Sequence, residues 1–132
     1  MDHAAFQSWL DRYIDAWHSN DAATVGDLFT EDALYRYHPW DEPPVRGREA
    51  IVGSWLGPDR DAPDSWKAEY RALAVDGDLG VAVGESRYLT EDRSAVERTY
   101  HNVFVCRFAD DGRCREFTEY YMLEKAPDDP AP

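Results

Sequence analysis

The chain has 132 residues, the length of one domain, and 43% of them are hydrophobic, which is enough for a single apolar core. Its net charge of −13 at pH 7 repels phosphate backbones and anionic membrane surfaces, so neither nucleic acid nor a membrane is an expected partner. The five Trp, eight Tyr and five Phe residues predict either a generous aromatic core or a cavity lined with rings.

Helical periodicity is confined to the first half of the chain. The expected helices cover 3–19, 22–29 and, after residues 46–49, a segment that ends at Gly57. Asp21 is a good N-cap for the second helix. Between the second and third helices, residues 33–38 alternate as a strand that places Tyr35 and Tyr37 on one face.

The second half of the chain alternates as strands. They cover 65–75, 79–90 and the two arms of a closing hairpin at 98–125. Helices that come early and strands that come late are typical of α+β proteins. We therefore expect a cone-shaped, curved antiparallel sheet with three N-terminal helices on its concave face. This single domain would end at residue 125, and a disordered tail would follow at 126–132.

The closing hairpin contains polar groups among apolar neighbours, and its register decides which of them meet. A three-residue loop at 110–112 places His101 diagonal to Glu119 on one face. A carboxyl beside an imidazole in an apolar cavity can act as a general acid or base. A sheet-stabilising or solvent-exposed pair is the alternative, and a two-residue loop would instead bring Asn102 beside Glu119.

The two cysteines lie on opposite arms of this hairpin. The same loop places Phe108 across from Cys114, so that Cys106 is two residues out of register for a disulfide bond. We therefore predict free thiols and a reducing cytoplasm. Charges in the first turns fit no signal peptide, and no apolar run is long enough for a membrane span.

Two further sets of side chains are candidate ligand contacts. Glu85 and Arg87 point to the same face of one strand, either as an ion pair on a pocket wall or as an exposed pair of little energetic value. Core packing explains any single aromatic ring, but together the rings exceed what three short helices need. The expected substrate-binding residues are Tyr13, Trp17, Trp55, Trp66, Glu85, Arg87 and Tyr121.

Several short motifs resemble the nuclear transport factor 2-like superfamily, and within it the SnoaL-like branch of polyketide cyclases and limonene-epoxide hydrolase. These motifs are 19–23 (SNDAA), 29–33 (FTEDA), 47–51 (GREAI), 111–113 (DGR) and 119–121 (EYY). The resemblance covers about residues 5–125 and implies an α+β cone with a deep pocket. It also implies a homodimer that pairs outer sheet faces.

The resemblance fits the epoxide hydrolase only in part. That enzyme's Tyr-x-Asn motif is matched by Tyr35 and Tyr37, its Arg-x-Asp motif by Glu85-Ser86-Arg87 with the charges inverted, and its last acid by Glu119. This mismatch argues against epoxide hydrolysis. Polyketide cyclases use an acid/base Asp or His, a chemistry that a pair of His101 and Glu119 would suit better.

The resulting hypothesis is a small-molecule pocket protein that acts as a cofactor-free acid/base isomerase, cyclase or dehydratase on an apolar, ring-containing carbonyl compound. Glu119 would be the acid or base, His101 its partner, and Tyr35 and Tyr37 the donors to a developing oxyanion. The alternative is a non-catalytic ligand-binding or dimerisation module. We expect neither a cofactor nor a metal ion, because His38 and the nearby loop acids match no metal-ligand spacing.

Overall fold

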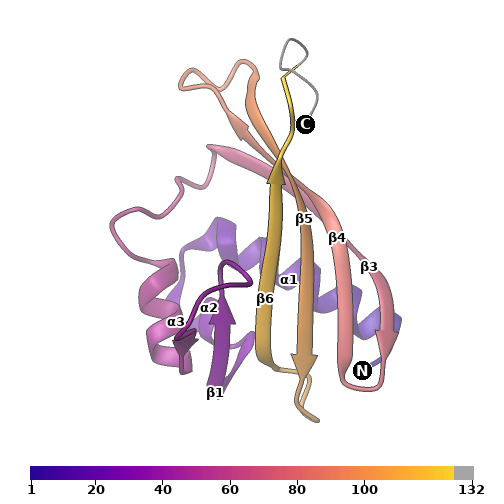
Figure 1. The fold of residues 1–132 in the computed structure, drawn as a ribbon. Helices are drawn as coiled ribbons and strands as arrows, with labels where there is room; N and C mark the ends of the chain where they lie inside the picture. The colour runs from indigo at the N-terminus through magenta and orange to yellow at the C-terminus, as the bar shows by residue number, and fades with distance from the viewer. Residues whose placement is uncertain (127–132) are drawn as a thin grey trace.

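The computed structural model of the protein describes residues 1–126, in which three helices and six strands form a helix-covered sheet (Figure 1). The elements are α1 (His3–Ser19), α2 (Ala22–Gly26), β1 (Phe29–Arg36), β2 (Val45–Arg46), α3 (Arg48–Trp55), β3 (Trp66–Asp76), β4 (Leu79–Leu89), β5 (Val96–Phe108) and β6 (Cys114–Leu123). Except for Ala126, the tail expected at 126–132 lies outside the described residues. Within the described part, no helix is both long and apolar enough to cross a membrane.

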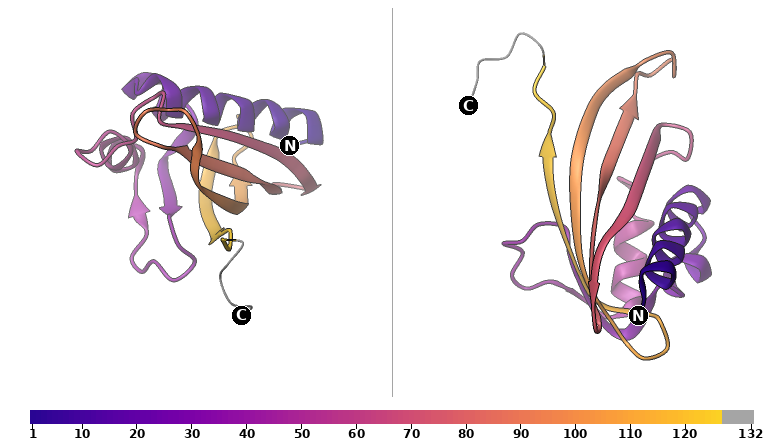
Figure 2. Two further views of the ribbon diagram at one scale, coloured as in Figure 1. Left: turned by 90° about the horizontal axis from the view of Figure 1, so that it is seen from above. Right: turned by 90° about the vertical axis from the view of Figure 1, so that its right-hand side faces the viewer.

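The six strands form one curved, unclosed sheet in the order β2-β1-β6-β5-β4-β3. Four of the five neighbouring pairs are antiparallel, whereas β1 runs parallel to β6. All three helices lie on the concave face of the sheet (Figure 2). The expected α+β class, with a curved sheet and helices on its concave side, is therefore confirmed, and one parallel pair is added to it.

The first helix is defined at both ends by local chemistry. The Asp2 carboxylate accepts a hydrogen bond from Ala5 N at 2.7 Å, and Asn20 adopts a left-handed conformation that ends the helix. Between these ends, α1 buries Phe6, Trp9 and Leu10 in the core. The Phe6 ring lies so close to the sheet that a Cβ at Gly80 would meet it at 2.7 Å, so only glycine fits there.

Two boundaries differ from those expected from the sequence. The second helix ends at Gly26, and β1 begins at Phe29, because Phe29 pairs with the start of β6 and is fully buried. The proline-rich segment after β1 contains a short strand, β2, that the sequence pattern did not indicate. It pairs with β1 through Leu34 and Tyr35.

The hairpin of β5 and β6 begins in the expected register and then shifts by one residue. Phe108 lies opposite Cys114 as predicted, but Arg107 lies opposite Glu116, so Arg115 is the extra residue of a β-bulge. Side chains alternate between the two faces of a strand. The extra residue therefore moves every later residue of β6 to the opposite face and gives it a different partner on β5.

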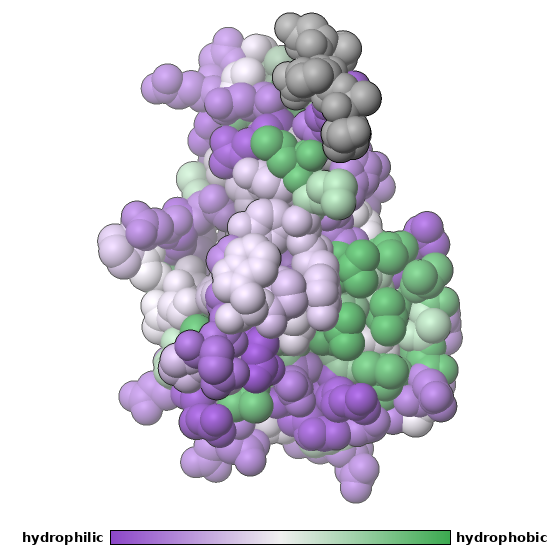
Figure 3. Space-filling model, viewed as in Figure 1, coloured by the Kyte–Doolittle hydropathy of each residue, from purple (hydrophilic) through white to green (hydrophobic). Residues whose placement is uncertain are grey.

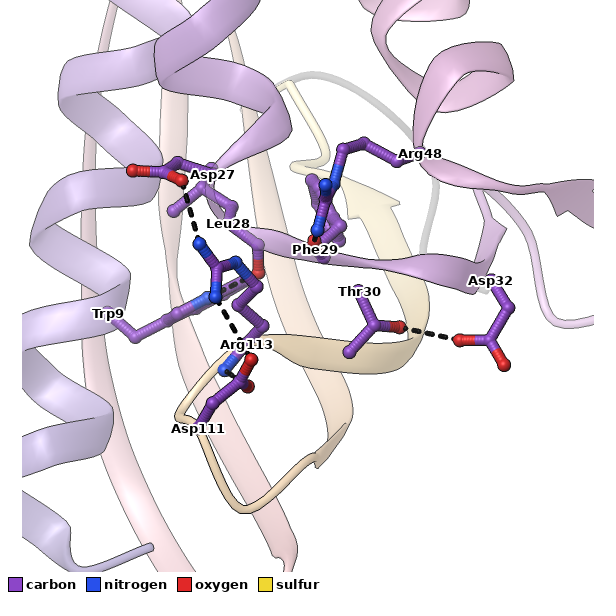
Figure 4. A network of polar contacts seen from close by, with 9 residues as sticks. All are labelled: Trp9, Asp27, Leu28, Phe29, Thr30, Asp32, Arg48, Asp111 and Arg113. Atoms are coloured by element: carbon purple, nitrogen blue, oxygen red, sulfur yellow. Dashed lines mark hydrogen bonds and ion pairs between the residues drawn. The ribbon is translucent and has the colours of Figure 1, made fainter.

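The corner that carries this bulge is fixed by polar contacts from three parts of the chain (Figure 4). The Arg113 guanidinium binds Asp27 after α2 and Asp111 in the hairpin loop, each at 3.0 Å. Trp9 Nε1 donates to Leu28 O at 3.0 Å, which ties α1 to the segment before β1. The start of β6 is thereby held against both α1 and α2.

Candidate functional site

A cavity of about 420 Å³ lies between the helices and the concave face of the sheet. This volume falls within the range of small-molecule sites, about 300–1,000 Å³. Aromatic rings with polar tips dominate its lining. The lining residues come from α1, β1, α3, the loop before β3, and strands β3 to β6.

Glu119 is the carboxyl group that the sheet contributes to the cavity. It projects from β6 on the same face as the buried Phe117 and lines the cavity wall. Burial raises the pKa of its carboxyl to about 7. No side chain or backbone group of residues 1–126 makes a hydrogen bond to this carboxyl. A half-buried acid without a hydrogen-bond partner among these residues, and with a pKa near neutrality, is suited to exchanging a proton with a ligand.

Paired hydroxyl groups lie around the carboxyl. The hydroxyls of Tyr13 and Tyr35 are 2.9 Å apart, and the Tyr37 hydroxyl is 2.6 Å from Ser54 Oγ. Each pair contains two O–H groups but uses one proton for its internal bond, so one proton per pair remains for a ligand oxygen. Burial raises the pKa of all three tyrosines, which therefore stay protonated as donors.

Asn102 is the residue of β5 that lies beside Glu119. It pairs with Tyr121 across the hairpin and is therefore diagonal to Glu119. Its side chain is 5% exposed, and its Oδ1 accepts a hydrogen bond from Ser86 Oγ at 3.0 Å. Because the carbonyl oxygen accepts this bond, the amide NH₂ is the group that can donate a hydrogen bond to a ligand in the cavity.

The cavity mouth combines charged and aromatic side chains. The Tyr88 hydroxyl lies 3.5 Å from Asp61 Oδ2, and the Arg98 guanidinium lies 4.6 Å above the Tyr88 ring. Burial raises the pKa of Asp61, while its contacts with Trp17 and Tyr88 oppose that shift. Sequence reasoning missed Asp61, because a polar loop carries no periodic signal that points to a neighbouring strand.

The expected pairing of His101 with Glu119 is wrong. The bulge on β6 puts Glu119 on the same face as Asn102, whereas His101 lies on the outer face of the sheet, where its Nε2 lies 2.9 Å from Glu124 and its Nδ1 lies 3.8 Å from Glu85. The alternative that brings Asn102 beside Glu119 describes the structure instead. The cause is the extra residue Arg115 on β6 rather than a two-residue loop.

Three other expected binding residues lie outside the cavity lining. Glu85 and Arg87 form an ion pair at 3.5 Å on the outer face, which agrees with the exposed-pair alternative. Trp66 is 1% exposed and stacks against Trp17 with ring centroids 3.5 Å apart, so it supports the cavity wall from behind. The expected residues that do line the cavity are Tyr13, Trp17, Tyr35, Tyr37, Trp55, Glu119 and Tyr121.

Metal ligation has no support in this part of the chain. Among residues 1–126, no three His, Cys, Asp or Glu side chains lie close enough together to hold a metal ion. Cys106 and Cys114 are both free and buried, away from the cavity lining.

The sequence matches the model of the SnoaL-like domain family over residues 10–117. The chain belongs to the SnoaL-like family. No curated protein matches this sequence.

Solved structures share the fold of this SnoaL-like protein at low sequence identity. A nuclear transport factor 2-like protein of unknown function from Burkholderia xenovorans LB400 aligns with a TM-score of 0.67 and 19% identity, over 95% of this chain and 89% of that one. A candidate ketosteroid isomerase from Kribbella flavida aligns with a TM-score of 0.66 and 16% identity, over 99% and 86%. A protein with a cystatin-like fold from Novosphingobium aromaticivorans aligns at 0.64 and 21%, over 89% and 80%.

Proposed function

We propose that this SnoaL-like protein binds an apolar, ring-containing carbonyl compound in the cavity and isomerises it by cofactor-free proton transfer. The observation that carries the proposal is Glu119, a half-buried carboxyl with a pKa of about 7 and no hydrogen bond from residues 1–126, in a cavity lined by tyrosine rings. The candidate ketosteroid isomerase among the similar structures supports the same reaction class.

The proposed reaction moves one proton within the substrate. The Glu119 carboxylate removes a proton from the carbon between a carbonyl group and a carbon–carbon double bond. The electron pair shifts onto the carbonyl oxygen, and the resulting dienolate accepts hydrogen bonds from the Tyr13–Tyr35 pair and the Asn102 amide. Protonated Glu119 then returns the proton at the far end of the conjugated system, so atoms and charge balance and the double bond has moved.

The lining also limits which ligands fit. Tyr13, Trp17, Trp55 and Tyr35 offer flat apolar faces. Among the polar lining groups, the Asn102 amide would bind the ligand oxygen and the Glu119 carboxylate would contact the carbon that loses its proton. Such a lining suits a cyclic ketone better than a linear or highly charged molecule.

We also propose that a second copy of the chain covers the outer face of the sheet. Hydrophobic side chains gather on this face over β5, β4 and β3 (Figure 3). Val103 is 36% exposed, Tyr120 45% and Met122 74%. Free, buried Cys106 and Cys114 support a reducing compartment, and we propose the cytoplasm.

The direct test is the conversion of cyclohex-3-en-1-one to its conjugated isomer, followed by ultraviolet absorbance. Wild-type protein should accelerate the conversion, and Glu119→Gln should lower kcat by at least about 100-fold, since general base catalysis contributes about 10²–10⁴. The matched control is Glu97→Gln, which alters an exposed glutamate at the start of β5. Turnover that survives Glu119→Gln, or no turnover by the wild type with this ketone and a bicyclic β,γ-unsaturated analogue, would refute the proposal in favour of a non-catalytic binding module.

A further inference from the structure

Tyr121 lies where the cavity opens, and its hydroxyl is held from outside the cavity. Its ring lines the cavity wall, while its hydroxyl lies 2.9 Å from Nε2 of His38. His38 follows β1 in the loop that projects from the sheet face opposite the helices (Figure 2). The side chain of Tyr121 therefore joins the cavity to this loop.

The imidazole of His38 is itself fixed in place. Its Nδ1 lies 3.1 Å from Asp41 Oδ1, and the other carboxylate oxygen of Asp41 accepts the His38 backbone N–H at 3.2 Å. The Trp40 ring stacks over the imidazole with centroids 4.9 Å apart. Three contacts thus set the position and the plane of the ring.

This arrangement decides which atom donates to which. A carboxylate only accepts, so the ring nitrogen that faces Asp41, Nδ1, is the one that carries a proton, and in an imidazole with a single proton Nε2 then has a lone pair. The Tyr121 hydroxyl must then donate to Nε2. With its proton engaged, the Tyr121 oxygen can only accept a hydrogen bond from a ligand at the mouth, and the hydrogen-bonded chain makes it a better acceptor.

We propose that Tyr121 is a specificity residue that recognises a hydrogen-bond donor on the outer end of the ligand, and that Asp41 and His38 are its positioning residues. The inference rests on the proposed function, in which the ligand carbonyl lies deeper, near Glu119. Glu119 and Tyr121 share one face of β6 two residues apart, which is about 7 Å along a strand. The substrate class is therefore a bicyclic ketone with a hydroxyl or amino group at the end opposite the carbonyl.

Two matched probes test this inference by calorimetric binding. In 6-hydroxy-1-tetralone the far oxygen donates, whereas in 6-methoxy-1-tetralone it can only accept. Wild-type protein should bind the hydroxy compound about 5- to 10-fold more tightly, the effect of one hydrogen bond. Tyr121→Phe should abolish that preference by weakening the hydroxy compound alone.

His38→Leu tests the positioning role. It leaves the Tyr121 hydroxyl without an acceptor, so the hydroxyl becomes free to donate to the methoxy oxygen. We expect the variant to bind the methoxy compound more tightly than the wild type does, so that the two compounds bind equally well. If His38 only stabilised the local structure, its loss would instead weaken the binding of both compounds alike. The matched control is His101→Leu, since His101 is on the outer face and should leave the preference unchanged.

The inference fails if Tyr121→Phe keeps the preference, if wild-type protein does not discriminate, or if neither tetralone binds. Its failure is separable from that of the proposed function. If cyclohex-3-en-1-one is still isomerised in a Glu119-dependent way while Tyr121→Phe changes no preference, the reaction stands and the recognition at the mouth does not.

Discussion

Glu119 lies directly opposite Phe104 in the β5–β6 ladder, one residue away from the partner that a regular three-residue hairpin would give it. That offset puts Glu119 on the same face as Asn102, whereas His101 lies on the outer surface. The acid that lines the cavity consequently has an amide rather than an imidazole as its diagonal neighbour on β5.

Substitutions at these two neighbouring positions of β5 should have opposite outcomes. Asn102→Leu removes the amide that faces the cavity, and we expect kcat/KM for the cyclic ketone to fall about 10- to 100-fold, as when one donor to an oxyanion is lost. His101→Asn should change it less than twofold. Steady-state kinetics on both variants measure this, and a large loss in the His101 variant would contradict the observed register.

The stability of the protein should fall as the pH rises through the titration range of Glu119. The carboxyl has a pKa of about 7 in the folded state against 4.5 when exposed, so the folded state binds its proton more tightly. The resulting stabilisation is complete below pH 4.5 and is lost by about pH 7. Relative to Glu119→Gln, the wild type should lose about 2 kcal/mol between pH 5 and pH 8.

Urea unfolding of both proteins at the two pH values measures that difference. The Gln variant is the reference because it keeps the shape of the side chain and cannot ionise. If the free energy of unfolding changed equally with pH in both proteins, the pKa of Glu119 would not be raised by burial as described.

Tyr13→Phe should separate catalysis from folding. Loss of the hydroxyl breaks the 2.9 Å bond to Tyr35 and leaves the Tyr35 proton as the pair's one donor, which its neighbour no longer orients or polarises, and we expect kcat to fall about 10-fold. The free energy of unfolding should fall by only about 1 kcal/mol, the usual value of one hydrogen bond. Tyr120→Phe, on the outer face, is the control and should preserve activity.

The outer face should determine the oligomeric state. Val103→Glu places a charge in the middle of the exposed apolar strands, and we expect it to convert a dimer to a monomer because an unpaired charge is costly to bury. Light scattering after gel filtration measures the mass. Val103→Leu should remain dimeric, and a wild-type protein that elutes as a monomer would exclude the proposed interface.

Spacing and alternation alone predicted much of this protein. Helical periodicity identified α1 and α3, alternation identified β3 to β6, and the placement of Tyr35 and Tyr37 on one face of a strand was correct because that rule needs only two neighbouring residues. The same local rule correctly put Glu119 and Tyr121 on one face of their strand.

The partners of these residues were decided only by the tertiary structure. The Cys114 end of the hairpin is held by Arg113 between Asp27 and Asp111, and the chain takes up one extra residue at Arg115 before pairing continues. A bulge of this kind depends on contacts between segments far apart in the sequence, and it reverses the faces of every residue beyond it. For that reason the sequence could place an acid in the cavity but could not show that Asn102, and not His101, lies beside it.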